Sequence, residues 1–564
     1  MNERRTLPSD FRHPLLRPNP FTARFVQIAI MIGGMGWILS ASSMAQDKPA
    51  ASAERVGPAT TGDGLIRNEP KAFRGYTLLS PLQSKSTYLI DMEGHVVKTW
   101  KTEFTPASLA YLLKNGDLLR PAESPRPAFG AGGGTGGRVQ RFNWEGELVW
   151  DYIVSNDQMV AHHDIAPMPN GNVMILIKER ISDQQAIAAG RVPASVQGSQ
   201  IFADALIEVR PTGLNTGEAV WKWRLWDHLV QEYDPGKENY GPVAEHPERV
   251  DLNYDEGIVG ARIGNPVNGG ADPSAVAGRG PFGPRGGPRG RRGGRGGTSN
   301  PDWTHTNAIA YNPELDQVML SIHEFSEVWI IDHSTTTQES AGHSGGRHGK
   351  GGDLLYRWGN PVVYRAGTEA DRRLFAQHDA HWIEPGLPGA GHLLVFNNGN
   401  GRPGGTHSSV DEVVLPVDKD GNYARDKDGK FGPSEAIWSY EAPNPPDFFS
   451  TFISGAQRMP NGNTVICSGA NGIMFEVTPD KQVVWNYMNP RRDERIGPGA
   501  ARGRGNRGGG PGIGGPSGRS IFRIYRFAPD YPALVGKNLT PGPTLVELTE
   551  AYYAKPAEAG ERAP

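Results

Sequence analysis

The sequence predicts an all-β fold, a six-bladed β-propeller with loop insertions rich in glycine and arginine. Three observations point to it: a strand pair that repeatedly ends on tryptophan, a repeated Gly-containing turn, and no run with a long amphipathic helical period. Six copies of an all-strand unit of roughly 40–50 residues fit a propeller better than a β-sandwich.

The first repeated piece is a strand, an acidic or glycine turn, and a second strand that closes on tryptophan. It occurs clearly at 88–100, 139–150 and 474–485. Looser copies run over 206–221, 328–358 and 413–438. We expect a tryptophan at the end of such a strand to pack between neighbouring blades.

The second repeated piece is a turn followed by a strand, at 114–119, 169–174 and 460–465. Each contains Asn-Gly, which is a strong hairpin signal because both residues tolerate positive φ. The strand at 522–527 is expected to complete a blade that begins nearer the N-terminus.

The N-terminus has the pattern of an export signal. Arginines precede an apolar run from Phe25 to Leu39, and small residues lead to Ala45, after which we expect cleavage. A retained signal anchor is the alternative, and either predicts a periplasmic or secreted protein. The expected organisation is a signal at 1–45, a linker at 46–70, a propeller at 71–535 with insertions at about 258–300 and 491–519, and a C-terminal tail at 536–564.

The composition argues against nucleic acid and membranes as general partners. The formal net charge is −3, and outside the signal no stretch is long and apolar enough to span a membrane. The Arg-Gly text at 284–295 resembles segments that bind single-stranded nucleic acid, but a disordered loop fits an exported protein without net basic charge better. The single cysteine, Cys467, lies in an apolar strand and is expected to be a buried small hydrophobe.

Four histidines occupy places where the inner strand of a blade is expected: His163, His305, His323 and His378. Equivalent positions in a propeller converge on its central channel, so these imidazoles are expected to meet there. A lone histidine in a strand is more often structural, and we assign that role to His162, His381, His392, His407 and the tract around His343 and His348. Metal ligation is a second functional interpretation, but no HExxH or Cys-His spacing supports it, so we predict neither metal nor cofactor.

These segments are where the chain resembles the bacterial periplasmic arylsulfate sulfotransferases, over most of residues 75–530. The matching motifs are His163-Asp164 with the turn at 169–172, Asp-Trp-Thr-His-Thr-Asn at 302–307, Gln-His-Asp at 377–379, Phe-Asn-Asn-Gly at 396–399 and the segment 456–463. The resemblance implies a six-bladed propeller and transfer of a sulfuryl group from an aryl sulfate donor to a phenolic acceptor, without the nucleotide donor PAPS.

By the same resemblance, His378 is expected to be the nucleophile that carries the group as a sulfohistidine. His163 and His305 are expected to transfer protons or to donate to the sulfuryl oxygens.

The chain departs from that family in two ways. His323 stands where the family places an arginine that clamps the anionic group, and an imidazole lacks the fixed charge and fork geometry of a guanidinium. Arg402 and Arg458 are the candidate substitutes for substrate binding. The cysteine pair of the family is also missing, which concerns stability more than chemistry.

Two alternatives remain at this stage. One is a propeller that binds a ligand or partner and has lost catalysis at the arginine position. The other is a quinoprotein-like propeller holding pyrroloquinoline quinone, which the periodic tryptophans resemble, although neither paired cysteines nor an acidic calcium site are evident.

Overall fold

The computed structural model describes residues 57–124, 129, 134–196, 199–254, 301–491 and 518–554. The predicted signal at 1–45, the insertion at about 258–300 and most of the insertion at 491–519 lie outside these residues. Within the described ranges, none of the helices has the length and apolar character needed to cross a membrane.

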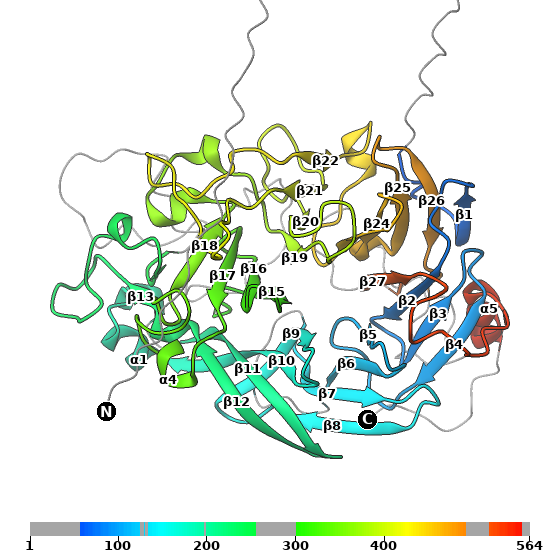
Figure 1. Cartoon of the computed structure of the whole chain (residues 1–564), viewed down its shortest axis with the longest axis horizontal. Helices are drawn as coiled ribbons and strands as arrows, with labels where there is room; N and C mark the ends of the chain where they lie inside the picture. Colours follow the sequence, from blue (N-terminus) through cyan, green and yellow to red (C-terminus); the bar gives the residue numbers. More distant parts are fainter. Residues whose placement is uncertain are drawn as a thin grey trace, which may run out of the picture. The chain divides into compact units, whose positions relative to one another are not determined.

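Six antiparallel sheets form the blades of a ring, which confirms the predicted six-bladed propeller (Figure 1). Blade 1 consists of β27 (Ile521–Phe527), β2 (Tyr76–Pro81), β3 (Ser86–Ile90) and β4 (Val96–Lys101); blade 2 of β5 (Tyr111–Leu112), β6 (Leu118–Glu123), β7 (Gly137–Phe142) and β8 (Leu148–Ile153); blade 3 of β9 (Met159–Pro167), β10 (Val173–Ser182), β11 (Gln200–Gly213) and β12 (Thr216–Arg224). Blade 4 consists of β15 (Thr306–Asn312), β16 (Gln317–Ile322), β17 (Glu327–Asp332) and β18 (Leu354–Trp358); blade 5 of β19 (His378–Trp382), β20 (Leu393–Asn397), β21 (Ser409–Val413) and β22 (Trp438–Tyr440); blade 6 of β23 (Gly455–Arg458), β24 (Thr464–Ser468), β25 (Ile473–Val477), β26 (Val483–Met488) and β1 (Gly64–Asn68).

The remaining elements are short and lie in the connections. They are β13 (Leu229–Val230), which pairs in parallel with β14 (Val250–Asp251), the helices α1 (Asp183–Ala188), α2 (Pro193–Val196), α4 (Thr337–Ser340) and α5 (Leu545–Ala554), and the 3-10 turns η1 (Leu225–Asp227), η2 (Val243–Glu245), η4 (Pro361–Tyr364), η5 (Glu369–Asp371), η6 (Pro445–Asp447) and η7 (Gly469–Asn471).

Both ends of the described chain close the ring. The predicted C-terminal strand is β27, which pairs with β2 so that Leu78 faces Tyr525. β1 falls within the segment expected to be linker and adds an outer strand to blade 6, with Leu65 opposite Tyr487. α5 falls within the expected tail and buries Leu545 in the core between blades 1 and 6. The folded part therefore extends beyond 71–535 at both ends. The sequence did not predict these segments, because one added outer strand and a helix with two buried residues leave no periodic signal.

The apolar core lies between the blades: six clusters of buried hydrophobic residues each join two neighbouring blades. At each of these junctions a tryptophan near the outer strand also donates its indole N–H to a backbone carbonyl of the next blade. The donors and acceptors are Trp100 to Asn143, Trp150 to Thr216, Trp223 to Gly352, Trp358 to Pro433, Trp438 to Pro479 and Trp485 to Met92. In the third repeat this tryptophan is Trp223, two residues beyond the expected Trp221. The indoles thus pack between blades as predicted.

Arg523 of β27 joins the inner strands across the channel. Its guanidinium is buried, with Nε 2.9 Å from Oδ1 of Asp379 and Nη1 3.2 Å from Oδ2 of Asp164. Asp164 also accepts the backbone N–H of Ile309 on β15, and Asp379 accepts that of Ala456 on β23. One cation and two carboxylates therefore connect blades 1, 3, 4, 5 and 6.

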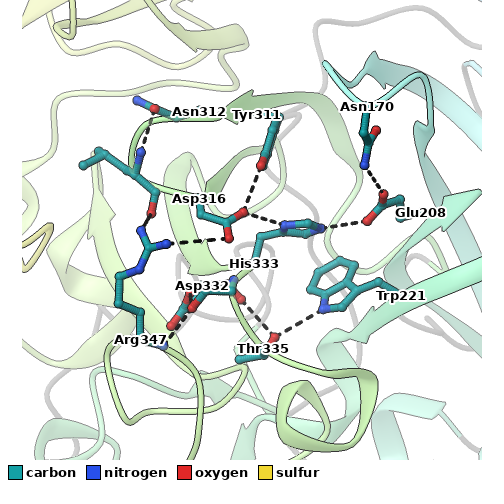
Figure 2. A network of polar contacts seen from close by, with 12 residues as sticks. Asn170, Glu208, Trp221, Tyr311, Asn312, Asp316, Asp332, His333, Thr335 and Arg347 are labelled. Carbon is teal, nitrogen blue, oxygen red and sulfur yellow. Dashed lines mark hydrogen bonds and ion pairs between the residues drawn. The ribbon is translucent and has the colours of Figure 1, made fainter.

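A polar network joins blades 3 and 4 farther out (Figure 2). His333 has Nδ1 2.8 Å from Asp316 and Nε2 3.0 Å from Glu208, and Trp221 donates to Thr335 at 3.2 Å. Burial lowers the pKa of His333, but its hydrogen bonds to Glu208 and Asp316 outweigh burial and raise that pKa above its ordinary value. For Glu208, burial by itself raises the pKa, but hydrogen bonds from His333 and two asparagines lower it to about 2.

We predict that Arg523→Met lowers the free energy of unfolding by about 3–5 kcal/mol, because it leaves two buried carboxylates without their cation. Arg523→Lys should fall between Met and the natural residue, since an ammonium keeps the charge but lacks the fork. Chemical denaturation followed by tryptophan fluorescence measures the effect. The matched control is Arg210→Met, which breaks an exposed ion pair with Glu218 and should cost less than about 1 kcal/mol. Equal costs for the two Met variants would contradict this role of Arg523.

We predict that His333→Gln lowers the thermal unfolding midpoint most in mildly acidic buffer. A histidine whose folded pKa is raised stabilises fully below its unfolded pKa of about 6.5, and that contribution is lost as the pH rises through the folded pKa. The difference between the natural protein and the variant should therefore shrink as the pH is raised. His95→Gln, at an exposed histidine beside Asp91, is the control and should shift the midpoint little. A difference that grows with pH would disprove the protonated bridge.

Candidate active site

His163 and His378 lie on inner strands and His305 directly precedes one, whereas His323 follows β16, the second strand of blade 4, so its predicted place on an inner strand is wrong. The three inner strands concerned are bulged. The register of β9 against β10 shifts opposite residues 162–164, that of β15 against β16 at residue 307, and that of β19 against β20 at residues 379–380. Positive φ angles occur at the same places: 48° at His163, 49° at His305 and 57° at Asp379. Bulges re-aim side chains and are common beside active sites. Non-glycine residues at positive φ are held there by their surroundings.

The structure brings all four sequence-predicted histidines into one row. The ring centroids of His163 and His305 are 4.5 Å apart, those of His305 and His323 are 5.1 Å apart, and those of His323 and His378 are 5.4 Å apart. Phe522 of β27 lies between the two ends of the row, with its ring centroid 6.4 Å from that of His378 and 6.0 Å from that of His163. We call these four histidines the histidine row.

His378 is held as a neutral imidazole with a defined tautomer. The side-chain N–H groups of Asn398 donate to the carbonyls of Ser450 and Ile453, so its Oδ1 faces His378 Nδ1 at 2.8 Å and accepts a hydrogen bond from the Nδ1–H. Nε2 accepts the backbone N–H of Ile453 at 3.1 Å, which places the lone pair on that nitrogen. Burial, followed by the neighbouring His323, lowers the pKa of His378 well below its ordinary value.

His305 is paired with a carboxylate. Its Nδ1 lies 2.6 Å from Oδ2 of Asp302, and the buried Lys178 ammonium lies 2.6 Å from the same oxygen. Burial raises the pKa of Asp302, but the opposing effect of His305 and Lys178 is larger and holds this pKa well below its usual range. The ionised Asp302 fixes the ring of His305 and leaves its Nε2 available for proton transfer.

His163 has a neighbour that sequence reasoning placed among the structural histidines. His162 Nδ1 lies 2.8 Å from His163 Nδ1, and its Nε2 lies 3.2 Å from Oδ1 of Asp204. Burial, then the charges of His305 and His162, lower the pKa of His163 well below its ordinary value. His162 therefore has a structural role that bears on the site, because its hydrogen bond orients the ring of His163.

His323 lies between His305 and His378 and contacts Glu324, with Nδ1 3.2 Å from Oε1. The side chains of His323 and His305 are 21% and 17% exposed, whereas His163 and His378 are almost fully buried. Solvent therefore reaches the row from the His305 and His323 side.

The two arginines expected to bind substrate are engaged elsewhere. Arg402 contacts Glu441 at 2.8 Å and Ser409 at 2.7 Å, and Arg458 contacts Glu412 at 2.5 Å in the interface of blades 5 and 6. Neither guanidinium contacts the histidine row.

A guanidinium that does neighbour the row is that of Arg523, which was not identified from the sequence. It pairs with Asp164 and Asp379, the residues that directly follow His163 and His378. The signal that could have revealed it is an arginine in the middle of the ring-closing strand, next to Phe522.

Comparisons with known proteins agree with this arrangement. The family model described as arylsulfotransferase (ASST) matches residues 70–494. The arylsulfate sulfotransferase AssT of Escherichia coli O6:H1 (strain CFT073) is 24% identical over 406 residues, which cover 69% of this chain and 58% of that protein. The AssT of Lelliottia amnigena is 22% identical over 404 residues, with the same coverage. The chain therefore matches a little over half the length of these relatives.

Among solved structures, a protein of unknown function from Bacteroides caccae aligns over 80% of this chain and 98% of its own, with 10% identity and a TM-score of 0.37. The hydrazine synthase of Kuenenia stuttgartiensis aligns over 62% and 71%, with 12% identity and a TM-score of 0.32. TM-scores this low support no conclusion about the fold or function of this chain. The family match is the finding that assigns the chain, because it covers most of the propeller and all four histidines of the row. The chain belongs to the arylsulfotransferase (ASST) family.

Proposed function

We propose that the protein transfers a sulfuryl group from an aryl sulfate to a phenol through a covalent intermediate on His378. The observation that carries this proposal is the convergence of His163, His305, His323 and His378 in the channel of a propeller of this family. Sulfuryl transfer needs a neutral nucleophile, proton donors and acceptors, and N–H groups that neutralise charge on oxygen. The histidine row and its surroundings supply each of these.

In the first half-reaction, Nε2 of His378 attacks sulfur and forms an N–S bond. The bond from sulfur to the aryl oxygen breaks, and its electron pair leaves with the phenolate, which His305 protonates. The positive charge that develops on the imidazole is relieved through the Nδ1–H that donates to Asn398. In the second half-reaction the acceptor phenol loses its proton to the same base and attacks sulfur, and the N–S electron pair returns to Nε2.

The N–H of Ile453 has a place in this chemistry. It donates to Nε2 of His378, so it loses its acceptor when that nitrogen bonds to sulfur. It then lies within reach of a sulfuryl oxygen and can donate to it. Ile453 has φ 49°, an unusual conformation for a β-branched residue that keeps this N–H aimed at the nucleophile.

Arg523 is our candidate for the positive charge that the family draws from an arginine at the position of His323. Its guanidinium lies behind the row, paired with Asp164 and Asp379, and it lowers the pKa of His378. It acts as a positioning residue, holding the histidines that precede its two aspartates. Direct contacts to the sulfuryl oxygens fall to His305 and His323.

We also propose that the protein works in the periplasm or outside the cell, because residues 1–45 have the pattern of an export signal. An aryl sulfate donor is a suitable substrate there, since the reaction needs no nucleotide.

We predict that His378→Ala abolishes phenol-dependent release of chromophore from a chromogenic aryl sulfate, with a loss of at least about a thousandfold. The matched control is His392→Ala in the same blade, whose histidine pairs with Glu412 outside the row and whose loss should leave the rate within about twofold. Release that does not depend on an acceptor, or that survives His378→Ala, would refute the proposal. Binding of aryl sulfates without turnover by the natural protein would favour a non-catalytic propeller.

We predict that the rate of the first half-reaction stays constant as the pH falls through the ordinary histidine pKa of about 6.5. Burial lowers the pKa of His378, so its imidazole remains neutral and nucleophilic in more acidic buffer. Single-turnover release of phenolate over a pH series, in excess enzyme, measures this limb. A rate that halves near the ordinary pKa would show that the nucleophile is not the buried imidazole.

A further inference from the structure

A second cluster of metal-ligating side chains lies away from the histidine row, between blades 3 and 4. It consists of His228, which directly follows η1, and of His343 and Asp353 in the connection between α4 and β18. One ligand atom from each residue lies within 4.8 Å of the others. Nδ1 of His228 and Nδ1 of His343 approach the same oxygen, Oδ1 of Asp353, at 2.8 and 2.7 Å.

The hydrogen bonds of His228 assign its ring nitrogens. Nε2 lies 2.9 Å from the backbone carbonyl of Ser340, and a carbonyl only accepts, so Nε2 carries the proton. A neutral ring with its proton there directs the lone pair of Nδ1 at the carboxylate of Asp353. Two acceptors at this distance repel each other, so either a second proton on the ring or a metal ion must balance them. A histidine that donates one ring N–H to a backbone carbonyl and presents the other nitrogen is also the usual arrangement of a metal ligand.

The surrounding chain is built closely around this cluster. Trp223 stacks on His228, with ring centroids 5.8 Å apart and planes 5° apart, and donates its indole N–H to the carbonyl of Gly352 at 2.8 Å. A Cβ at Gly352 would lie 2.1 Å from the Ser340 carbonyl oxygen and 2.6 Å from Nε2 of His228. Only glycine permits this approach, and the approach places the next residue, Asp353, against both histidines.

We propose that His228, His343 and Asp353 bind a divalent zinc ion. Two imidazoles and one carboxylate form a donor set suited to zinc, with one coordination position left for water or another ligand. The side chain of His343 is 44% exposed, which leaves that side of the site open, whereas His228 is fully buried. The ion ties the glycine-rich connection of blade 4 to the edge of blade 3. This differs from the sequence-based expectation of no metal, because ligands at 228, 343 and 353 form no short motif.

The test uses the full chain, treated with chelator, incubated with excess zinc and freed of unbound metal by gel filtration. We expect about one zinc ion per chain by elemental analysis. His343→Ala should weaken zinc binding at least about tenfold, and His348→Ala, at a histidine in the same connection but outside the cluster, should not. Zinc should also raise the thermal unfolding midpoint of the natural protein and of His348→Ala, and leave that of His343→Ala unchanged.

Two results would overturn the proposal. One is the absence of bound zinc in the natural protein, which would mean that a protonated His228 pairs with Asp353. The other is equal zinc in His343→Ala and His348→Ala, which would place the metal elsewhere. Because His343 is half exposed, its alanine variant is expected to fold, and a far-ultraviolet circular dichroism spectrum checks this. Asp353→Asn provides a second variant that removes a ligand without changing side-chain size. Neither readout depends on sulfuryl transfer.

Discussion

The buried ion pairs of Arg523 with Asp164 and Asp379 are the interaction on which the rest of the site depends. Two carboxylates buried near one another repel, and each loses its hydration, so they need a shared cation and further hydrogen bonds. Arg523 supplies the cation from the strand that closes the ring. The backbone N–H groups of Ile309 and Ala456 supply the further bonds from the neighbouring blades. The pairs therefore form only when the ring is complete, and they fix the two histidines that precede the aspartates.

Burial then determines how the histidines divide their tasks. His378 and His163 are almost fully buried, and this lowers the pKa of both, so they remain neutral. His305 is more exposed and pairs with the ionised Asp302, which steadies its ring during proton transfer. In the proposed reaction, the fold thus places an uncharged imidazole as the nucleophile beside a carboxylate-linked imidazole as the proton carrier, without a cofactor in the proposed steps. Pairs of groups in contrasting environments are how proteins assign acid and base roles.

Much of the fold was predictable because a propeller repeats its local signals. The hairpin turns and terminal tryptophans revealed the blades, and repeat-matched positions identified His163, His305 and His378 before any contact was known. His323 reaches the row from the end of β16, the second strand of blade 4, which the repeat pattern did not predict. The features that could not be predicted depend on contacts that form only when the ring of blades closes. Arg523 faces its aspartates only once β27 joins β2. Both tryptophans of β12 reach blade 4, but it is Trp223 that meets the backbone carbonyl of Gly352, while Trp221 donates to Thr335. Arg402 and Arg458 seemed available, but carboxylates of blade 5 and its connections hold them.

The most direct test of the central claim is to locate the transferred group. The protein is mixed with an aryl sulfate in the absence of a phenol acceptor, quenched in alkali and digested, and the peptides that carry His163, His305 and His378 are mapped by mass spectrometry. The account predicts the added mass of one SO₃ group on His378 alone, and its disappearance when a phenol is added before the quench. An adduct on another residue, or one on His378 that persists in the presence of phenol, would contradict it.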